Sequence, residues 1–193
     1  MKKTLSDSEF LHQLTTLLLQ EGISSLTVAT IAARLHCSRR RLYEFATTKE
    51  DLFCKVVQDF FDETLQLAER KVAEAKDRAS ALRASLEVGA KASAHFSLAF
   101  LQDVEASAQA KAIFDRYQEI RSQRICLLID QGVSEGVFVP CHGQVVSQAL
   151  LSAAFRLRTP AFLATTGLSL EQAFDELYRV FLGGLLASTD PSR

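Results

Sequence analysis

Apolar residues recur at spacings of three and four along most of the chain, which is the pattern of amphipathic helices. A first helix is expected from about Asp7 to Gln20, ended by Gly22. Pro160 is expected to mark a boundary between elements. With only 3 Pro and 8 Gly in 193 residues, the expected fold class is all-α. From Thr48 onward, helices are expected at about 48–75, 78–93, 95–106, 108–135, 143–158 and 170–187.

The segment 27–52 shows a different pattern, with two short helices joined by a tight turn. The first has a single apolar stripe formed by Val28, Ile31, Ala32 and Leu35. Thr27 and Ser38 each precede a helix and are N-cap candidates, and Leu42 and Phe45 form the buried side of the second helix. A capped helix, a short turn and a second capped helix form a helix-turn-helix in outline.

The second short helix begins with Arg39, Arg40 and Arg41. Guanidinium groups match guanine edges and phosphates, so an arginine-rich helix start suits the major groove of DNA. The alternative is a solvated face on which Arg40 pairs with Glu44 one turn later. Cations in a first turn oppose the helix macrodipole, at a cost of roughly 0.3 kcal/mol or more each. The arginines alone leave both interpretations open.

The surrounding residues resemble the DNA-binding region of the TetR family of bacterial transcriptional regulators. The matching motifs are Thr27, Ile31-Ala32, Ser38, Leu42-Tyr43-Glu44-Phe45 and Lys49-Glu50-Asp51-Leu52. The resemblance implies an N-terminal three-helix DNA-binding domain in residues 1–47 and a C-terminal helical domain for effector binding and dimerisation in 48–193. It also implies that phosphate contacts or positioning of the reading helix come from Thr27, Ser38, Tyr43 and Lys49, and that Arg39, Arg40 and Arg41 reach base edges or phosphates.

Three positions depart from the family pattern. His36 stands in the turn, where the family often has Gly, and a non-glycine residue is less suited to a left-handed conformation. Glu44 stands where His is common, so a carboxylate lies near the phosphates unless Arg40 neutralises it. One additional residue before Lys49 shifts this lysine relative to its expected phosphate. Thr48 and Asp51 form a capping box, so the next helix is expected to start there.

The charge is close to balanced, which argues against a protein that coats nucleic acid. The formal net charge is −1. Residues 1–50 hold 7 Lys and Arg against 5 Asp and Glu, whereas the remainder holds 15 against 18. A small local excess of basic residues suits site-specific binding.

Targeting and metal-binding signals are weak. No run of 18 apolar residues predicts a membrane span. Lys2-Lys3 followed by apolar residues imitates a signal peptide, but Asp7 and Glu9 interrupt the apolar stretch. We therefore expect a cytoplasmic protein, with no cofactor and no metal. The four cysteines have no metal or redox spacing and are expected to be reduced; they are Cys37, Cys54, Cys126 and Cys141.

Two C-terminal helices are apolar on more than one side, which predicts a second buried face. In the TetR family, the corresponding last two helices form a four-helix bundle across a two-fold axis. The alternative is that one subunit buries both faces. The candidate interface of a homodimer comprises Val146, Ala149, Leu150, Ala153, Phe174, Leu177, Phe181 and Leu185.

An effector pocket is implied by the resemblance more than by any residue. Apolar pockets with a few polar groups bind small molecules, although aromatic residues at helical spacing are usually core. The candidate lining residues are His95, Phe96, Phe100, Asp103, Phe114, Tyr117, Phe155 and Arg158.

The favoured function is a homodimeric, site-specific regulator of transcription that binds double-stranded DNA. The resemblance implies a repressor that a small-molecule effector releases from an inverted-repeat operator. A helical protein-interaction module is the alternative. An enzyme is disfavoured because the sequence has no Ser-His-Asp arrangement, no phosphate-binding glycine loop and no HExxH motif.

Overall fold

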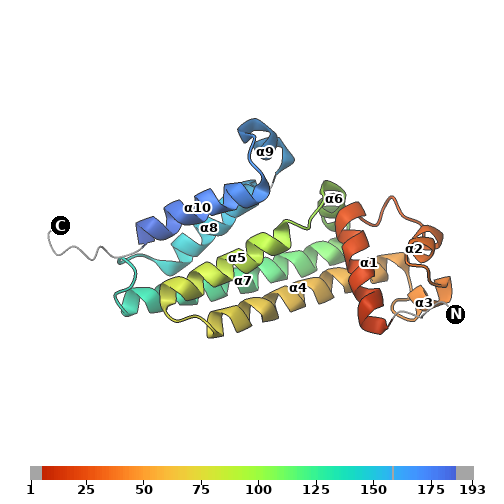
Figure 1. Ribbon diagram of the computed structural model, residues 1–193, viewed down its shortest axis with the longest axis horizontal. Coiled ribbons are helices and arrows are strands. Elements are labelled where there is room, and N and C mark those ends of the chain that lie inside the picture. Colours follow the sequence, from red (N-terminus) through yellow and green to blue (C-terminus); the bar gives the residue numbers. More distant parts are fainter. Residues whose placement is uncertain (1–5, 158, 186–193) are drawn as a thin grey trace. The chain divides into compact units, whose positions relative to one another are not determined.

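The computed structural model describes residues 6–157 and 159–185, and most of these lie in helices (Figure 1). The all-α prediction is confirmed. In chain order the helices are α1 (Asp7–Glu21), α2 (Val28–Arg34), α3 (Arg39–Tyr43), α4 (Lys49–Ala73), α5 (Arg78–Ser93), α6 (Leu98–Ala106), α7 (Ala108–Ser134), α8 (Gly143–Leu157), α9 (Pro160–Thr166) and α10 (Leu170–Leu185).

Most predicted helices agree with these bounds to within a few residues. The largest shift of a predicted start is at α6, because Ser97 is its N-cap and accepts a hydrogen bond from the Phe100 amide at 3.0 Å. Pro160 marks a boundary, as predicted, but the short helix α9 that begins at this residue was not predicted. Proline is favoured in the first turn of a helix, where its missing N–H needs no partner.

The chain packs into two compact units. The first comprises the residues up to Glu63 together with His95–Tyr117, and the second comprises Thr64–Ala94 and the residues from Gln118 onward. Both α4 and α7 therefore contribute to both units. The predicted division at residue 47 differs from these units, because α6 packs against α1. As a division by function, 1–47 and 48–193 stay a prediction.

The first unit is built around α1 and the helix-turn-helix. Phe10, Leu14 and Leu18 line the buried side of α1, and Ile31 and Leu42 bring α2 and α3 onto the same core. The second unit has its own core between α5, α7, α8 and α10. Its fully buried side chains include Leu82, Leu86, Ile125, Ile129, Phe138 and Leu150.

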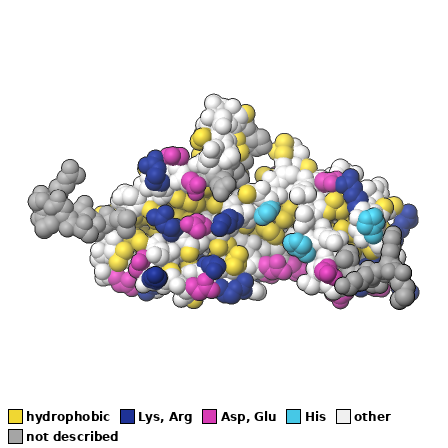
Figure 2. Space-filling view, viewed as in Figure 1, with side chains coloured by type: hydrophobic (Ala, Val, Ile, Leu, Met, Phe, Trp, Pro, Cys, Tyr) yellow, Lys and Arg dark blue, Asp and Glu magenta, His cyan; other side chains and the backbone are white. Residues whose placement is uncertain are grey.

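Charges of both signs are intermixed on the face seen in Figure 2, with hydrophobic side chains visible between them. None of the helices in residues 6–157 and 159–185 has the length and apolar character needed to cross a membrane. All four cysteines are free thiols. Burial raises the pKa of the Cys54 thiol.

Candidate nucleic-acid interface

The helices of the predicted helix-turn-helix start at hydroxyl caps. The Thr27 hydroxyl accepts a hydrogen bond from the Thr30 amide at 3.1 Å, and the Ser38 hydroxyl accepts one from the Arg41 amide at 3.2 Å. The Thr48 hydroxyl accepts one from the Asp51 amide at 3.0 Å, at the start of α4. Each hydroxyl satisfies an amide that has no partner inside its own helix.

The turn between α2 and α3 is closed by backbone hydrogen bonds. The amides of His36 and Cys37 donate to the carbonyls of Ala33 and Ala32, at 3.2 and 2.9 Å. His36 has a φ of 50°, and it is the one non-glycine residue with positive φ in the described part of the chain. The position where the family often has glycine thus adopts the left-handed conformation that glycine favours.

Five of the seven predicted DNA-binding residues have exposed side chains: Thr27, Ser38, Arg39, Arg40 and Tyr43. The side chain of Arg40 is 91% exposed, and its Nε lies 3.7 Å from Oε1 of Glu44. Both side chains of this ion pair are exposed, so water and salt weaken the attraction between them. Arg39 forms no hydrogen bond or ion pair with any residue that the structure describes.

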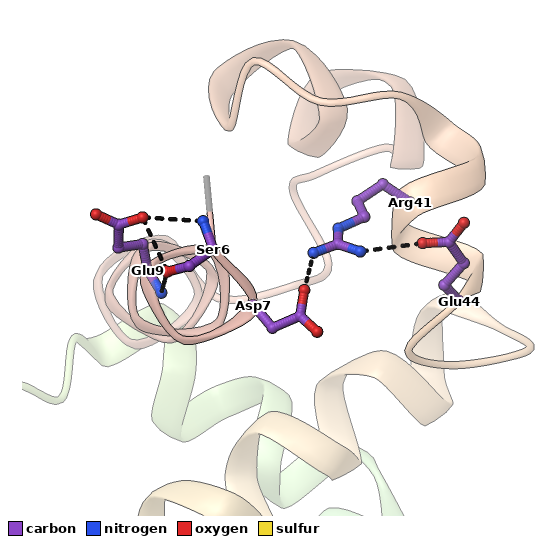
Figure 3. Close-up of polar contacts among 5 residues, drawn as sticks. All are labelled: Ser6, Asp7, Glu9, Arg41 and Glu44. Atoms are coloured by element: carbon purple, nitrogen blue, oxygen red, sulfur yellow. Dashed lines mark hydrogen bonds and ion pairs between the residues drawn. The ribbon is translucent and has the colours of Figure 1, made fainter. Parts of the chain in front are cut away.

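Arg41 differs from Arg39 and Arg40 because its guanidinium turns back toward α1 (Figure 3). It donates hydrogen bonds to Asp7 and, at 3.2 Å, to Glu44. It also lies 5.4 and 5.2 Å from the ring centroids of Phe10 and Phe45, within reach of a cation–π interaction. These carboxylates raise the pKa of Arg41 further. In this geometry Arg41 positions α3 against α1.

Lys49 is also engaged within the protein. Its Nζ donates to the backbone carbonyls of Ile23 and Leu26, at 3.1 and 2.9 Å. The ammonium group therefore holds the loop between α1 and α2 at the start of α4. The one-residue shift noted in the sequence is consistent with this use, and the phosphate contact of Lys49 stays a prediction.

The same loop is held from the other side by Asp103 of α6. This carboxylate is 8% exposed and accepts hydrogen bonds from the amides of Ile23 and Ser24, at 2.5 and 3.0 Å, and from the Ser24 hydroxyl. A Cβ at Gly22 would clash with this carboxylate. The prediction of Asp103 as a pocket residue is therefore corrected, because both of its oxygens are occupied by the loop. The sequence contained no signal for this contact across about eighty residues.

The other predicted pocket residues that the structure describes are divided between the two units. Four of them belong, together with Phe61, to a cluster of rings in the first unit with centroids 4.3 to 6.4 Å apart: Phe96, Phe100, Phe114 and Tyr117. His95 is exposed. Phe155 is 56% exposed on α8, in the second unit. Arg158 lies outside the described residues. Rings at these separations pack as a hydrophobic core.

The predicted interface residues divide into two groups. Leu150, Phe174 and Leu185 are 1 to 5% exposed and belong to the core of the second unit, so their assignment to an interface was wrong. Ala149 is exposed, and the half-buried members are Val146, Ala153, Leu177 and Phe181. The most exposed large apolar side chains of α8 and α10 are instead Val145 and Val180, each 64% exposed, followed by Phe155 at 56%. The sequence showed that both helices are apolar on two sides, but it did not show which side the subunit covers.

No family model and no curated protein matches the sequence. Solved structures do resemble it. A transcriptional regulator from Saccharomonospora viridis in complex with choline has a TM-score of 0.78 and 14% identity, covering 93% of this chain and 96% of that chain. A TetR transcription regulator from Haloarcula marismortui has a TM-score of 0.76 and 19% identity, covering 93% and 100%. The ketosteroid regulator KstR2 of Mycobacterium tuberculosis has a TM-score of 0.60 and 18% identity, covering 96% and 98%. By its arrangement of helices, the chain has the fold of the TetR-family transcriptional regulators.

Proposed function

We propose that this protein is a site-specific DNA-binding regulator of transcription, and that it represses from an inverted-repeat operator until a small-molecule effector releases it. The observation behind this proposal is the exposed surface of Thr27, Ser38, Arg39, Arg40 and Tyr43 on the helix-turn-helix, referred to below as the reading surface.

The chemistry of the reading surface suits both kinds of DNA contact. Hydroxyl groups of serine, threonine and tyrosine bind phosphate oxygens and fix the register of a protein on the duplex. Arg39 and Arg40 extend into solvent, where a guanidinium can bind O6 and N7 of guanine with two hydrogen bonds. Arg41 and Lys49 support this surface from behind through their internal contacts.

A homodimer would present two reading surfaces to the two halves of an inverted repeat, roughly 34 Å apart or a multiple of that distance. The outward sides of α8 and α10 support this arrangement. Val145 and Val180 are exposed there, and a Cβ added at Gly183 or Gly184 would meet open space. Small residues of this kind let a partner helix approach closely.

The effector is proposed by analogy with the choline-bound regulator from Saccharomonospora viridis. An effector releases DNA when it binds the DNA-incompetent conformation more tightly than the competent one. The fold, the reading surface and the similar regulators favour a protein without catalytic activity. A regulator that binds DNA is expected to act in the cytoplasm.

The first test is selection of bound sites from random duplex DNA by the purified full chain, followed by sequencing. An enriched inverted repeat is expected. Weak, salt-sensitive binding without enrichment would contradict site-specific regulation and favour a protein-interaction module.

The second test replaces both Arg39 and Arg40 with Ala and measures affinity for the selected site. We expect a loss of about tenfold or more and a shallower dependence of affinity on salt. A matched control replaces Arg70 and Arg116, two exposed arginines outside the helix-turn-helix, and removes the same charge. Equal losses in both variants would mean that the reading surface is wrongly assigned.

A further inference from the structure

Arg121, in the middle of α7, is the one Lys or Arg side chain that is buried in the described part of the chain. It is 9% exposed and belongs to the second unit. Burial strips water from a guanidinium, which is costly unless opposite charge or hydrogen-bond acceptors replace the water. The Arg121 guanidinium therefore requires acceptors or an anion in place of water.

No hydrogen bond or ion pair joins Arg121 to any residue within 6–157 or 159–185. Arg124, one turn later on α7, has both an ion-pair partner and a hydrogen-bond acceptor. Arg124 pairs with Glu69 at 2.5 Å and donates to the Leu65 carbonyl at 3.0 Å. Arg121 is thus more buried than Arg124 and has fewer partners.

Helix α5 leaves room for the Arg121 head group. The guanidinium lies against Gly89, where an added Cβ would clash with its terminal nitrogen and its central carbon. Ser85 and Ser93 lie one turn before and one turn after Gly89, and both are buried. The Ser93 hydroxyl donates to the Gly89 carbonyl at 2.8 Å, whereas the Ser85 hydroxyl forms no hydrogen bond with the described residues.

Gln118 adds a second polar group on the same side of α7, three residues before Arg121. Its side-chain Oε1 is buried and has no hydrogen-bond partner among the described residues. Arg121 and Gln118 on one side of α7, and Ser85 one turn from Gly89 on α5, therefore have hydrogen-bonding capacity that the described residues do not use. A guanidinium that is 9% exposed and has no protein partner among the described residues is unusual in a folded protein, and a bound anion would satisfy it.

We propose that Arg121 binds the oxyanion of a small organic acid, either a carboxylate or a phosphate ester, and that the Ser85 hydroxyl and the Nε2 group of Gln118 are further donors, since the Oε1 atom of Gln118 can only accept. A guanidinium matches both groups because its two parallel N–H bonds fit two oxygens of the anion. Ser85 can donate a third hydrogen bond. The ligand site rests on the geometry alone, whereas its role as the effector site rests on the proposed function.

A different hollow of about 260 Å³ lies between α5 and α10 and is lined by both signs of charge. Arg83 and Arg179 are opposed there by Glu87 and Asp175, and Arg179 is already paired with Glu176. A mixed lining selects neither anions nor cations. Arg121 favours anions because it is a cation that forms no ion pair with the described residues.

The test uses the full chain without DNA and measures binding of acetate, octanoate, inorganic phosphate, octyl phosphate and octan-1-ol by calorimetry and thermal shift. We expect octanoate or octyl phosphate to bind and to raise the melting temperature, while octan-1-ol does not. The tighter of the two anions identifies the head group. Binding of no anion at millimolar concentration, or equal binding of octan-1-ol, would overturn the proposal.

Variants separate a ligand anchor from a structural arginine. Arg121→Met should weaken binding of the anion by about 30-fold or more and raise the melting temperature of the ligand-free protein, because an uncompensated charge is removed. Arg116→Met makes the same change at an exposed position of α7 and should alter neither. Unchanged anion binding by Arg121→Met would refute the assignment.

Gly89→Ala tests whether the position of the Arg121 guanidinium matters, because it changes no charge. The same variant tests the proposal if Arg121→Met fails to fold. The added methyl group displaces the guanidinium, so anion affinity should fall here too. Because no DNA is present, the two proposals fail separately. Anion binding without site-specific DNA binding would refute only the proposed function, and DNA binding without anion binding would refute only the ligand class.

Discussion

Arg41 of α3 is hydrogen-bonded to Asp7 in the first turn of α1, and its guanidinium lies over the rings of Phe10 and Phe45. Three consecutive arginines thus have different roles. Arg41 fixes the orientation of α3, and this leaves Arg39 and Arg40 extended into solvent. The position of the reading surface therefore depends on the contacts that Arg41 makes with α1.

Replacing Arg41 with Met should therefore lower the melting temperature, because Asp7 and Glu44 lose their donor and α3 loses its link to α1. Arg40→Met is the matched control, since the side chain of Arg40 is 91% exposed. It should leave the melting temperature unchanged but make the slope of log affinity for DNA against log salt concentration shallower by about one. A double-mutant cycle with Asp7→Asn measures the coupling, and a coupling of zero would mean that the Arg41–Asp7 bond contributes nothing.

Asp103 should be essential for the stability of the first unit. Asp103→Ala leaves the amides of Ile23 and Ser24 without acceptors, and we expect a loss of about 2 to 4 kcal/mol in the free energy of unfolding. Glu105→Ala removes an exposed carboxylate from the same helix and should change stability by roughly 0.5 kcal/mol or less. Chemical denaturation measures both variants. Equal effects would show that the Asp103 contacts are not stabilising.

The turn at His36 should become more stable when it is replaced by glycine. A left-handed conformation is costly for a residue with a Cβ, and glycine removes that cost while losing more backbone entropy on folding. We expect His36→Gly to raise the free energy of unfolding by roughly 0.5 kcal/mol or more. His36→Ala keeps the Cβ and should give no gain. A destabilised glycine variant would mean that the imidazole makes a favourable interaction in solution.

Local features of the first unit could be predicted from the sequence because they depend on neighbours in the chain. Thr27, Ser38 and Thr48 were identified as caps from their positions, and each makes the expected hydrogen bond. Contacts between distant residues could not be predicted in this way. Nothing near Asp103 in the sequence indicates that its carboxylate holds Ile23 and Ser24.

The reading surface was predicted by residue type but not by side-chain direction. Arg39, Arg40 and Arg41 are identical in the sequence, and only the rings and carboxylates packed around Arg41 distinguish it. Leu150 and Val145 present the same problem on α8, because hydrophobicity alone does not tell which of two apolar sides the subunit buries.

Asp51 should give α4 a stability that depends on pH. The Thr47 hydroxyl donates to Asp51 Oδ2 at 2.7 Å, and hydrogen bonds from Thr47 and Thr48 lower the pKa of Asp51 below its ordinary value of 3.8. A lowered pKa means that the unfolded chain binds the proton more readily, so the contribution is present above about pH 4 and is lost as the pH falls through the folded pKa.

The measurement is the free energy of unfolding of the wild type and of Asp51→Asn between pH 2.5 and 6. The wild type should be more stable at pH 6, and the two curves should converge at the acidic end. Glu63→Gln removes an exposed carboxylate of α4 and controls for the loss of charge alone. A constant difference across the range would rule out the ionised carboxylate as the cause.

The outward sides of α8 and α10 should decide whether the protein is a dimer. Val180 is 64% exposed in the isolated subunit, so a glutamate there should be tolerated by the fold. In a dimer the same glutamate would be stripped of water at the interface, which weakens association on the order of 100-fold. Leu127→Glu places the same charge at an aliphatic position of α7 that is 60% exposed. Analytical ultracentrifugation should therefore find Val180→Glu monomeric and Leu127→Glu dimeric, both with wild-type helix content. Since one subunit covers only half of an inverted repeat, Val180→Glu should also lose affinity for the selected DNA. A dimeric Val180→Glu variant would mean that the two-fold axis lies at another surface.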